Sequence, residues 1–348
     1  MILQNLIIVS FIITFAYAGF FDSFRPCHYY ETCECGTSQP WIRNPHGESV
    51  DAKALEEKLE AKLYGQPLVI EELSNAIANH INKKNPSKAL SIALHGLAGT
   101  GKSYTSKIVA DFLYQKGLNS QYAHLFLGGI RNCGEYQDCL RNHQSDIHST
   151  ILATLKKCHR GLFIIDEVDD MPTEVLNSLM SFLDEQDNVF GVDPRKSIFI
   201  FLSNSGSNEI ANKTLEYYNK GIPRHQIPAS EMEKIIRNAA CAKTVKKENS
   251  GFEKCKLLTR NLIQFHLPFL PLQHEHINLC IKTYLRTKNE HYLATSHHFL
   301  EKATEQIEFT PKENPVFSTY GCRPVEKIVD RLLNVEHKKK SGTTKNEL

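Results

Sequence analysis

The chain has 348 residues, with 41 basic and 39 acidic side chains and a formal net charge of +2. This balance gives no electrostatic reason to expect nucleic acid as a partner. An apolar content of 41% is typical of a soluble globular protein and argues against one with many membrane spans. The length allows one large α/β domain and a smaller second one.

Residues 1–18 predict a cleaved secretory signal peptide. They contain no charged side chain, their apolar core starts at Leu6, and they end in Ala-Tyr-Ala, a small-residue cleavage signature. The core is short for a membrane span, and a retained anchor is the alternative. The last four residues, KNEL, differ at one position from the K-D-E-L retrieval signal. Both ends of the chain therefore indicate the lumen of the endoplasmic reticulum.

Cysteine usage and a glycosylation sequon agree with that compartment. Residues 19–45 form a segment with Cys27, Cys33 and Cys35, and ten cysteines in all are many for a reduced cytosolic enzyme. Asn212-Lys213-Thr214 is the only N-x-[ST] sequon and predicts a glycan on Asn212. An unmodified surface turn is the alternative.

Next along the chain, short apolar runs alternate with helical patterns. An amphipathic stretch over 51–81 breaks at Gly65-Gln66-Pro67, and then come four predicted strands, each followed by a helix: 91–96, 122–128, 161–166 and 197–204. The helices are expected from Lys102, over 144–159, over 173–186 and after 204. Nearly continuous apolar strands separated by helices predict a parallel sheet that is covered on both faces.

The strands are expected to cease after Pro271. Helical patterns over 273–288, 296–306 and 323–335 predict a small helical domain. We therefore divide the chain into a large domain over 46–272, a helical domain over 273–337 and a basic, disordered tail over 338–348.

The turn between the first strand and its helix reads HGLAGTGKSY. It matches G-x-x-x-x-G-K-[ST] without a gap, through Gly96, Leu97, Ala98, Gly99, Thr100, Gly101, Lys102 and Ser103. Glycines let successive N–H groups point inward and form an anion-binding nest at the helix start. Lys102 is then expected against the β- and γ-phosphates of a nucleotide, with the Ser103 hydroxyl as a ligand of Mg²⁺. A Gly-rich turn without a ligand is the alternative.

Polar side chains end two of the other predicted strands. LFIIDEVDD places Asp166 and Glu167 at the end of a buried strand, and SIFIFLSN ends in Asn204. Asp166 suits Mg²⁺, while Glu167 can polarise an attacking water that the neutral amide of Asn204 holds near the γ-phosphate. The alternatives are a helix cap for the carboxylates and a turn former for the asparagine.

A cation opens the last helical pattern, GCRPVEKIVDRL. Arg323 stands at its start, where a guanidinium can reach the γ-phosphate from the small domain and report nucleotide state as a change in domain angle. A surface arginine is the alternative.

The order of these motifs resembles that of AAA+ ATPases, and more narrowly that of the torsins, which are Clp-like AAA+ proteins of the endoplasmic reticulum and nuclear envelope lumen. The resemblance covers roughly residues 45–335 and rests on the stretches KLYGQ, GLNSQYAHLF, FIFLSN, NSGF, RNLIQFHLPFLPL, FTPKE and FSTYGC. It implies an α/β P-loop fold, a parallel sheet sandwiched by helices with a small C-terminal helical domain. It also implies ATP and Mg²⁺ at the residues named above, and hydrolysis that remodels proteins or membrane-associated assemblies.

The resemblance also implies a disulfide between Cys280 and Cys322, which can couple redox state to nucleotide binding or serve only as a structural staple. Ser103 stands where torsins commonly carry Asn, and GCR replaces GCK. Residues 131–142, with Cys133 and Cys139, match the family poorly and are expected to form an extra disulfide-closed loop.

The absence of one arginine indicates that the protein needs a partner for hydrolysis. In related Clp-type ATPases an Arg before the small domain reaches the neighbour's nucleotide, and that position falls on Leu262, with Arg260 two residues away. The resemblance implies that a membrane-spanning activator with a torsin-like lumenal domain supplies the Arg in trans, within a homo- or hetero-oligomer of AAA+ subunits. Two other functions stay open: a P-loop kinase, and a nucleotide-dependent switch or scaffold with little hydrolysis.

Overall fold

The computed structural model describes residues 51–129, 136–241 and 261–343. The predicted signal peptide, the cysteine-containing segment 19–45, Cys133, Arg260 and the KNEL terminus lie outside the described residues. Within the described parts of the chain, no helix combines the length and the hydropathy that a membrane crossing requires.

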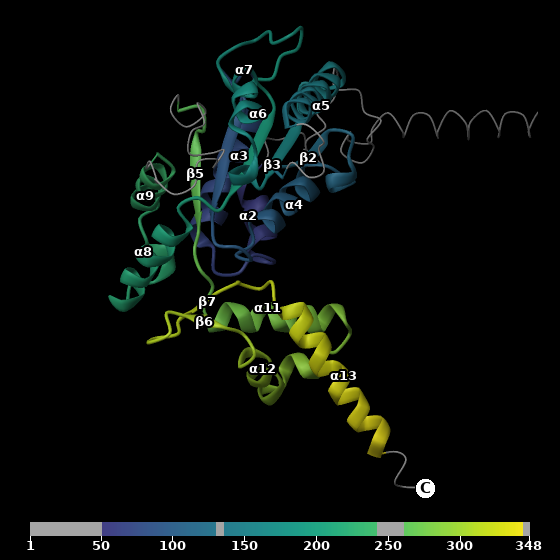
Figure 1. Cartoon of the computed structure of the whole chain (residues 1–348), viewed down its shortest axis with the longest axis vertical. Coiled ribbons are helices and arrows are strands. Elements are labelled where there is room, and N and C mark those ends of the chain that lie inside the picture. The colour runs from purple at the N-terminus through teal and green to yellow at the C-terminus, as the bar shows by residue number, and fades with distance from the viewer. Residues whose placement is uncertain (1–50, 130–135, 242–260, 344–348) are drawn as a thin grey trace, which may run out of the picture.

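The large domain is built on a five-stranded parallel sheet with the strand order β2-β3-β4-β1-β5 (Figure 1). The strands are β1 (Leu90–Gly96), β2 (Ala123–Leu127), β3 (Leu162–Asp166), β4 (Ile198–Ser203) and β5 (Phe265–Phe269). In the register, His95 lies opposite Ser203, and Asp166 lies opposite Leu127. The carboxyl ends of all five strands therefore meet at one edge of the sheet, which is where parallel α/β sheets bind ligands.

Strand β5 is an addition to the four strands that the sequence pattern predicts. It pairs with β1 at the outer edge of the sheet. Its sequence, FHLPF, contains Pro268, and a proline in the middle of an apolar run argues against a central strand. An edge strand tolerates proline because one side of its backbone makes no hydrogen bonds to another strand, which is the position that β5 occupies.

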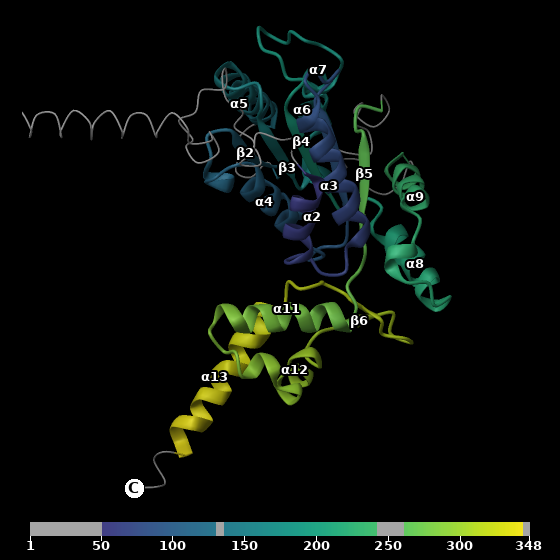
Figure 2. The same ribbon diagram turned by 180° about the vertical axis from the view of Figure 1, so that it is seen from behind.

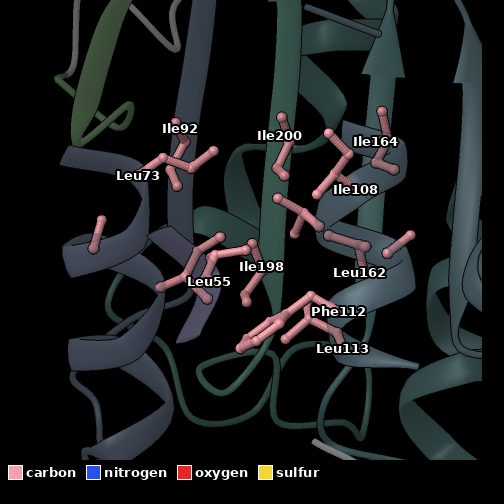
Figure 3. Close-up of a cluster of buried hydrophobic side chains, with 14 of the residues drawn as sticks. Leu55, Leu73, Ile92, Ile108, Phe112, Leu113, Leu162, Ile164, Ile198 and Ile200 are labelled. Atoms are coloured by element: carbon pink, nitrogen blue, oxygen red, sulfur yellow. The ribbon is translucent and has the colours of Figure 1, made fainter. Parts of the chain in front are cut away.

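The sheet is buried on both faces because alternate side chains point to opposite sides. Ile164, Ile198 and Ile200 pack under α2 (Ala52–Glu60), α3 (Pro67–Asn82) and α4 (Lys102–Leu113), as Figure 3 shows. On the other face, phenylalanines of β3 and β4 pack under α5 (Tyr136–Lys157), α6 (Thr173–Ser178) and α7 (Met180–Leu183). The near-continuous apolar strands follow from this double burial.

Two helices beside β5 complete the large domain (Figure 1). They are α8 (Ser207–Asn219) and α9 (Ala229–Cys241), and they share a small apolar cluster with Leu68 and Leu270.

Three predicted boundaries of the large domain need correction. Helix α5 begins at Tyr136, eight residues before the expected start at 144, so the expected loop over 131–142 is wrong from Tyr136 onward. The predicted helix 173–186 is two short helices, α6 and α7, which meet at Leu179. Leu179 is fully buried and caps one helix while it starts the other.

The small domain consists of α11 (His274–Thr287), α12 (His297–Thr304) and α13 (Val325–Thr343) around their own apolar cluster (Figure 2). It also contains a short antiparallel pair, β6 (Phe309–Thr310) and β7 (Phe317–Ser318), so the expectation that strands cease after Pro271 is wrong. The backbone of α13 continues to Thr343, so the disordered tail expected from residue 338 is wrong up to that residue.

Candidate nucleotide-binding site

The Gly-rich turn joins the end of β1 to the start of α4. Its backbone needs glycine at two positions, since φ is 76° at Gly99 and 114° at Gly101. A Cβ atom added to Gly99 would lie 2.0 Å from the carbonyl oxygen of Tyr320, and one added to Gly101 would lie 2.7 Å from Leu63. The turn is further tied by the Thr100 hydroxyl, which donates to the Leu97 carbonyl at 2.8 Å. The structure thus has a concave turn with no room for side chains on its glycines.

Lys102 lies inside this turn. Its Nζ donates to the carbonyl oxygens of Gly96 at 2.6 Å and Leu97 at 2.9 Å, and to Oδ1 of Asn204 at 3.0 Å. Burial lowers the pKa of Lys102 to about 8, although the carboxylates of Asp166 and Asp169 act in the opposite direction. A partly desolvated ammonium group is therefore held at the carboxyl edge of the sheet, beside the first turn of α4.

Ser103 and Asp166 meet next to that ammonium group. The Ser103 hydroxyl donates to Oδ2 of Asp166 at 2.8 Å, and Oδ1 of the same carboxylate accepts the backbone N–H of Glu167 at 2.8 Å. A hydroxyl and a carboxylate oxygen are hard oxygen ligands, which Mg²⁺ prefers. The donor set fits Mg²⁺ bound together with phosphate oxygens.

Glu167 follows Asp166 in a left-handed conformation, with φ of 55°. Non-glycine residues in this region of φ/ψ space are uncommon and cluster at functional sites. The conformation starts the 3₁₀ turn Val168–Asp170 and leaves the Glu167 side chain exposed. Glu167 is thus held at the same edge of the sheet as Lys102.

The structure therefore brings together residues from three separate motifs of the sequence. Lys102, Ser103, Asp166 and Asn204 are joined in pairs by hydrogen bonds, and Glu167 is bonded through its backbone to Asp166.

The segment that leads into α13, which begins at Val325, contacts the Gly-rich turn through its backbone. The Cys322 N–H donates to the Gly99 carbonyl at 3.0 Å, and a Cβ on Gly321 would lie 2.2 Å from that same oxygen. Cys322 forms the disulfide with Cys280 of α11 that the resemblance implies. The exposed Arg323 side chain lies close enough to lower the pKa of Lys102. The small domain thus touches the candidate phosphate-binding turn directly.

A second connection to the turn runs through Gln66, which the sequence reading did not single out. Its side chain is 1% exposed, donates to the carbonyls of Thr100 at 3.3 Å and Leu270 at 2.8 Å, and accepts the Leu270 N–H at 2.8 Å. Its only signal in the sequence is a polar residue at a helix start, inside the KLYGQ stretch. Gln66 links the turn to the segment that leads into the small domain.

Arg224 holds that same segment. Its guanidinium donates to the carbonyls of Gly65, at 2.9 Å, and Pro271, and at 2.8 Å to Oε1 of Gln273, the residue that caps α11. Burial lowers the pKa of Arg224 to about 10. Nothing in the local sequence indicates this role, because all three acceptors lie far away along the chain.

Two other predicted positions lie away from this edge. Asn212 is exposed on α8, but Thr214 of its sequon is 2% exposed and donates to the Ile210 carbonyl within the helix. Leu262, at which the family resemblance implies the missing arginine, is 6% exposed and belongs to the core cluster that contains α5.

Solved structures with a similar fold define the class of protein. The S. cerevisiae Hsp104–ADP complex matches with a TM-score of 0.58 and 18% identity, over 90% of this chain and 51% of that one. The S. cerevisiae Hsp104–casein complex matches with a TM-score of 0.55 and 17% identity, over 85% and 48%. The chain spans about half the length of these solved chains. With its parallel sheet and P-loop turn, it has the AAA+ ATPase fold.

Sequence comparisons narrow the class to a family. The family profile described as Torsin matches residues 27–165. A Torsin-like protein of Caenorhabditis elegans is 33% identical over 316 residues, which make up 90% of this chain and 83% of that protein. A Torsin-like protein of Drosophila melanogaster is 32% identical over 277 residues, 79% of each. The chain belongs to the torsin family.

Proposed function

We propose that this AAA+ protein of torsin type binds ATP with Mg²⁺ at the carboxyl edge of its sheet and hydrolyses it. The observation that carries the proposal is the pair of hydrogen bonds Lys102–Asn204 and Ser103–Asp166. These bonds join the phosphate-binding turn to the ends of two neighbouring strands, where hydrolysis needs a cation, metal ligands and a group that orients water.

Each side chain has a role in this proposal. Lys102 exchanges its two carbonyl partners for the β- and γ-phosphate oxygens and keeps its bond to the Asn204 amide. Ser103 and Asp166 hold Mg²⁺, which supplies charge neutralisation at the phosphates. Glu167 accepts a proton from the attacking water, and the Asn204 amide orients that water. The hydrogen bond between the Cys322 N–H and the Gly99 carbonyl holds Arg323 beside the turn, where its guanidinium places a second cation near the γ-phosphate.

We further propose that turnover is slow until a partner supplies an arginine. Leu262 is buried and apolar, so it cannot extend a cation toward a neighbouring subunit. An arginine finger accelerates hydrolysis by about 10³- to 10⁵-fold. The family resemblance supports a membrane-spanning activator with a torsin-like lumenal domain as its source, within a homo- or hetero-oligomer.

The proposed location is the lumen of the endoplasmic reticulum and the contiguous nuclear envelope. The signal-like first 18 residues, the KNEL terminus and the Cys280–Cys322 disulfide support it. The proposed task is chaperone-like remodelling of proteins or membrane-associated assemblies. A solved structure of similar fold is an Hsp104–casein complex, which supports a protein as the substrate.

Affinity capture with Glu167→Gln tests the function. The variant keeps ATP binding but lacks the base, so with Mg-ATP it should retain its activator and substrate, and release them when ATP is withdrawn. Glu174→Gln, the same change at an exposed residue of α6, should behave like the unaltered chain. ATP-independent capture by both variants would contradict the proposal, and ATP binding without hydrolysis in the presence of the captured partner would favour the switch.

A further inference from the structure

We propose that Asp169 is a positioning residue for hydrolysis, which fixes the Asn204 amide against Lys102. The inference rests on the ATPase function proposed above and adds a residue to it.

Three hydrogen-bond donors from the end of β4 converge on the Asp169 carboxylate. Oδ1 accepts the hydroxyls of Ser203 at 2.9 Å and Ser205 at 2.6 Å, and Oδ2 accepts the backbone N–H of Asn204 at 2.5 Å. Ser203 itself is 1% exposed. A carboxylate is the only common side chain with two acceptor oxygens and no donor, so it can serve all three groups at once.

The position of Asp169 in the chain connects these bonds to the proposed base, Glu167. Asp169 lies in the 3₁₀ turn Val168–Asp170, which begins directly after Glu167. The residue that anchors Asn204 therefore stands two positions from the proposed base. This turn therefore links the position of Glu167 to that of Asn204, although the two residues lie far apart in the sequence.

The backbone just after β4 is also held by a buried pair of histidines, His95 of β1 and His266 of β5. His95 Nδ1 lies 3.2 Å from the Ser205 carbonyl, and His95 Nε2 lies 3.1 Å from Nδ1 of His266. A carbonyl only accepts, so His95 Nδ1 carries the proton and His266 donates to His95. Asp169 and His95 thus both hold the turn after β4 by hydrogen bonds.

The orientation of the Asn204 side-chain amide is set by its bond to Lys102. Its Oδ1 accepts from the Lys102 ammonium at 3.0 Å, which directs the Nδ2 hydrogens away from the lysine. Asp169 fixes the backbone of Asn204, and Lys102 fixes which end of the amide faces the phosphates. Without Asp169, the Asn204 amide would still be able to bind water, but its position relative to Lys102 would no longer be fixed.

Asp169→Asn tests the role with a minimal change of shape. An amide has one acceptor oxygen, so at least one of the three donors must face an NH₂ group. Asp170→Asn is the matched control, because Asp170 occupies the next position of the same turn and is exposed.

The assay is single-turnover hydrolysis of Mg-ATP by the full chain in excess, with the partner captured by Glu167→Gln present, together with the equilibrium dissociation constant for Mg-ATP. Asp169→Asn should lower the single-turnover rate by about ten- to a hundredfold, the cost of misplacing a catalytic group. It should change the dissociation constant by less than about twofold, since the phosphate contacts remain. Asp170→Asn should leave both unchanged.

A double-mutant cycle distinguishes an effect of Asp169 through Asn204 from a general loss of structure at the site. If Asp169 acts through Asn204, adding Asp169→Asn to Asn204→Ala should lower the rate by less than about twofold more. Multiplicative losses, or an unchanged rate in Asp169→Asn alone, would overturn the inference while the ATPase function stands. Absence of hydrolysis in the unaltered chain with the captured partner present would overturn both. Should Asp169→Asn fail to fold, Ser205→Ala removes one donor to the same carboxylate and should lower the rate without weakening ATP binding.

Discussion

Gly99→Ala is expected to separate the small domain from the phosphate-binding turn. The new methyl group would lie 2.0 Å from the Tyr320 carbonyl oxygen, which is closer than real Cβ contacts allow. Either the turn or the segment before α13 must therefore shift, and the Cys322 N–H bond to the Gly99 carbonyl would be lost.

The magnitude has three parts. A Cβ in the left-handed conformation costs about 1–2 kcal/mol, and overpacking against backbone costs about 1–3 kcal/mol. The lost hydrogen bond adds about 0.5–1.5 kcal/mol. Together these terms should lower the free energy of unfolding by about 2.5–6.5 kcal/mol.

Urea unfolding followed by circular dichroism measures this change, and Gly221→Ala is the matched control. Gly221 has a similar φ of 70°, but nothing lies within 4 Å of a Cβ built there, so only the backbone cost of about 1–2 kcal/mol should appear. The difference between the two variants isolates the contact between the domains. Equal destabilisation by both substitutions would refute the reasoning.

Buried groups elsewhere give three further expectations. Arg224→Gln leaves neutral acceptors, the Gly65 and Pro271 carbonyls, without a donor and should lower the free energy of unfolding by about 1–3 kcal/mol. Arg195→Gln, at a partly exposed ion pair, should cost less, and an equal cost would contradict the role of Arg224. Burial holds the pKa of His95 near 4 and that of His266 near 3, below their ordinary 6.5, so both take up protons mainly on unfolding. The contribution of these two histidines to the free energy of unfolding should be constant above about pH 6.5 and fall toward pH 4, by about 1.4 kcal/mol per pH unit for each histidine. His266→Asn should flatten the slope over this range, and an unchanged slope would contradict the assignment. Cys280→Ser should lower stability by about 2–4 kcal/mol and weaken ATP binding through Cys322, whereas unchanged ATP affinity would make the disulfide a structural staple only.

The Gly-rich turn could be predicted because its functional residues are neighbours in the sequence. Lys102 and Ser103 lie in one eight-residue pattern, and the parallel sheet brings the ends of β1, β3 and β4 to one edge. The side chains of Asp166 and Asn204 therefore had to lie near the turn once the strands were recognised.

The remaining features depend on contacts that no local pattern reveals. In the run DEVDD, the choice between Asp169 and Asp170 as the anchor of β4 depends on how a 3₁₀ turn directs each side chain. Gln66 and Arg224 act on backbone atoms far away in the sequence, such as the Leu270 and Pro271 carbonyls. An amphipathic pattern records which residues are buried, but not which carbonyl a buried polar group will meet.

Equilibrium binding of Mg-ATP to Lys102→Ala tests the central claim most directly, with Lys107→Ala, an exposed lysine of the same helix, as the control. Loss of the buried ammonium group should weaken binding by more than about a hundredfold, and the control should bind as the unaltered chain does. If Lys102→Ala binds ATP as tightly as the unaltered protein, the site is not where the nucleotide is held, and the account is wrong.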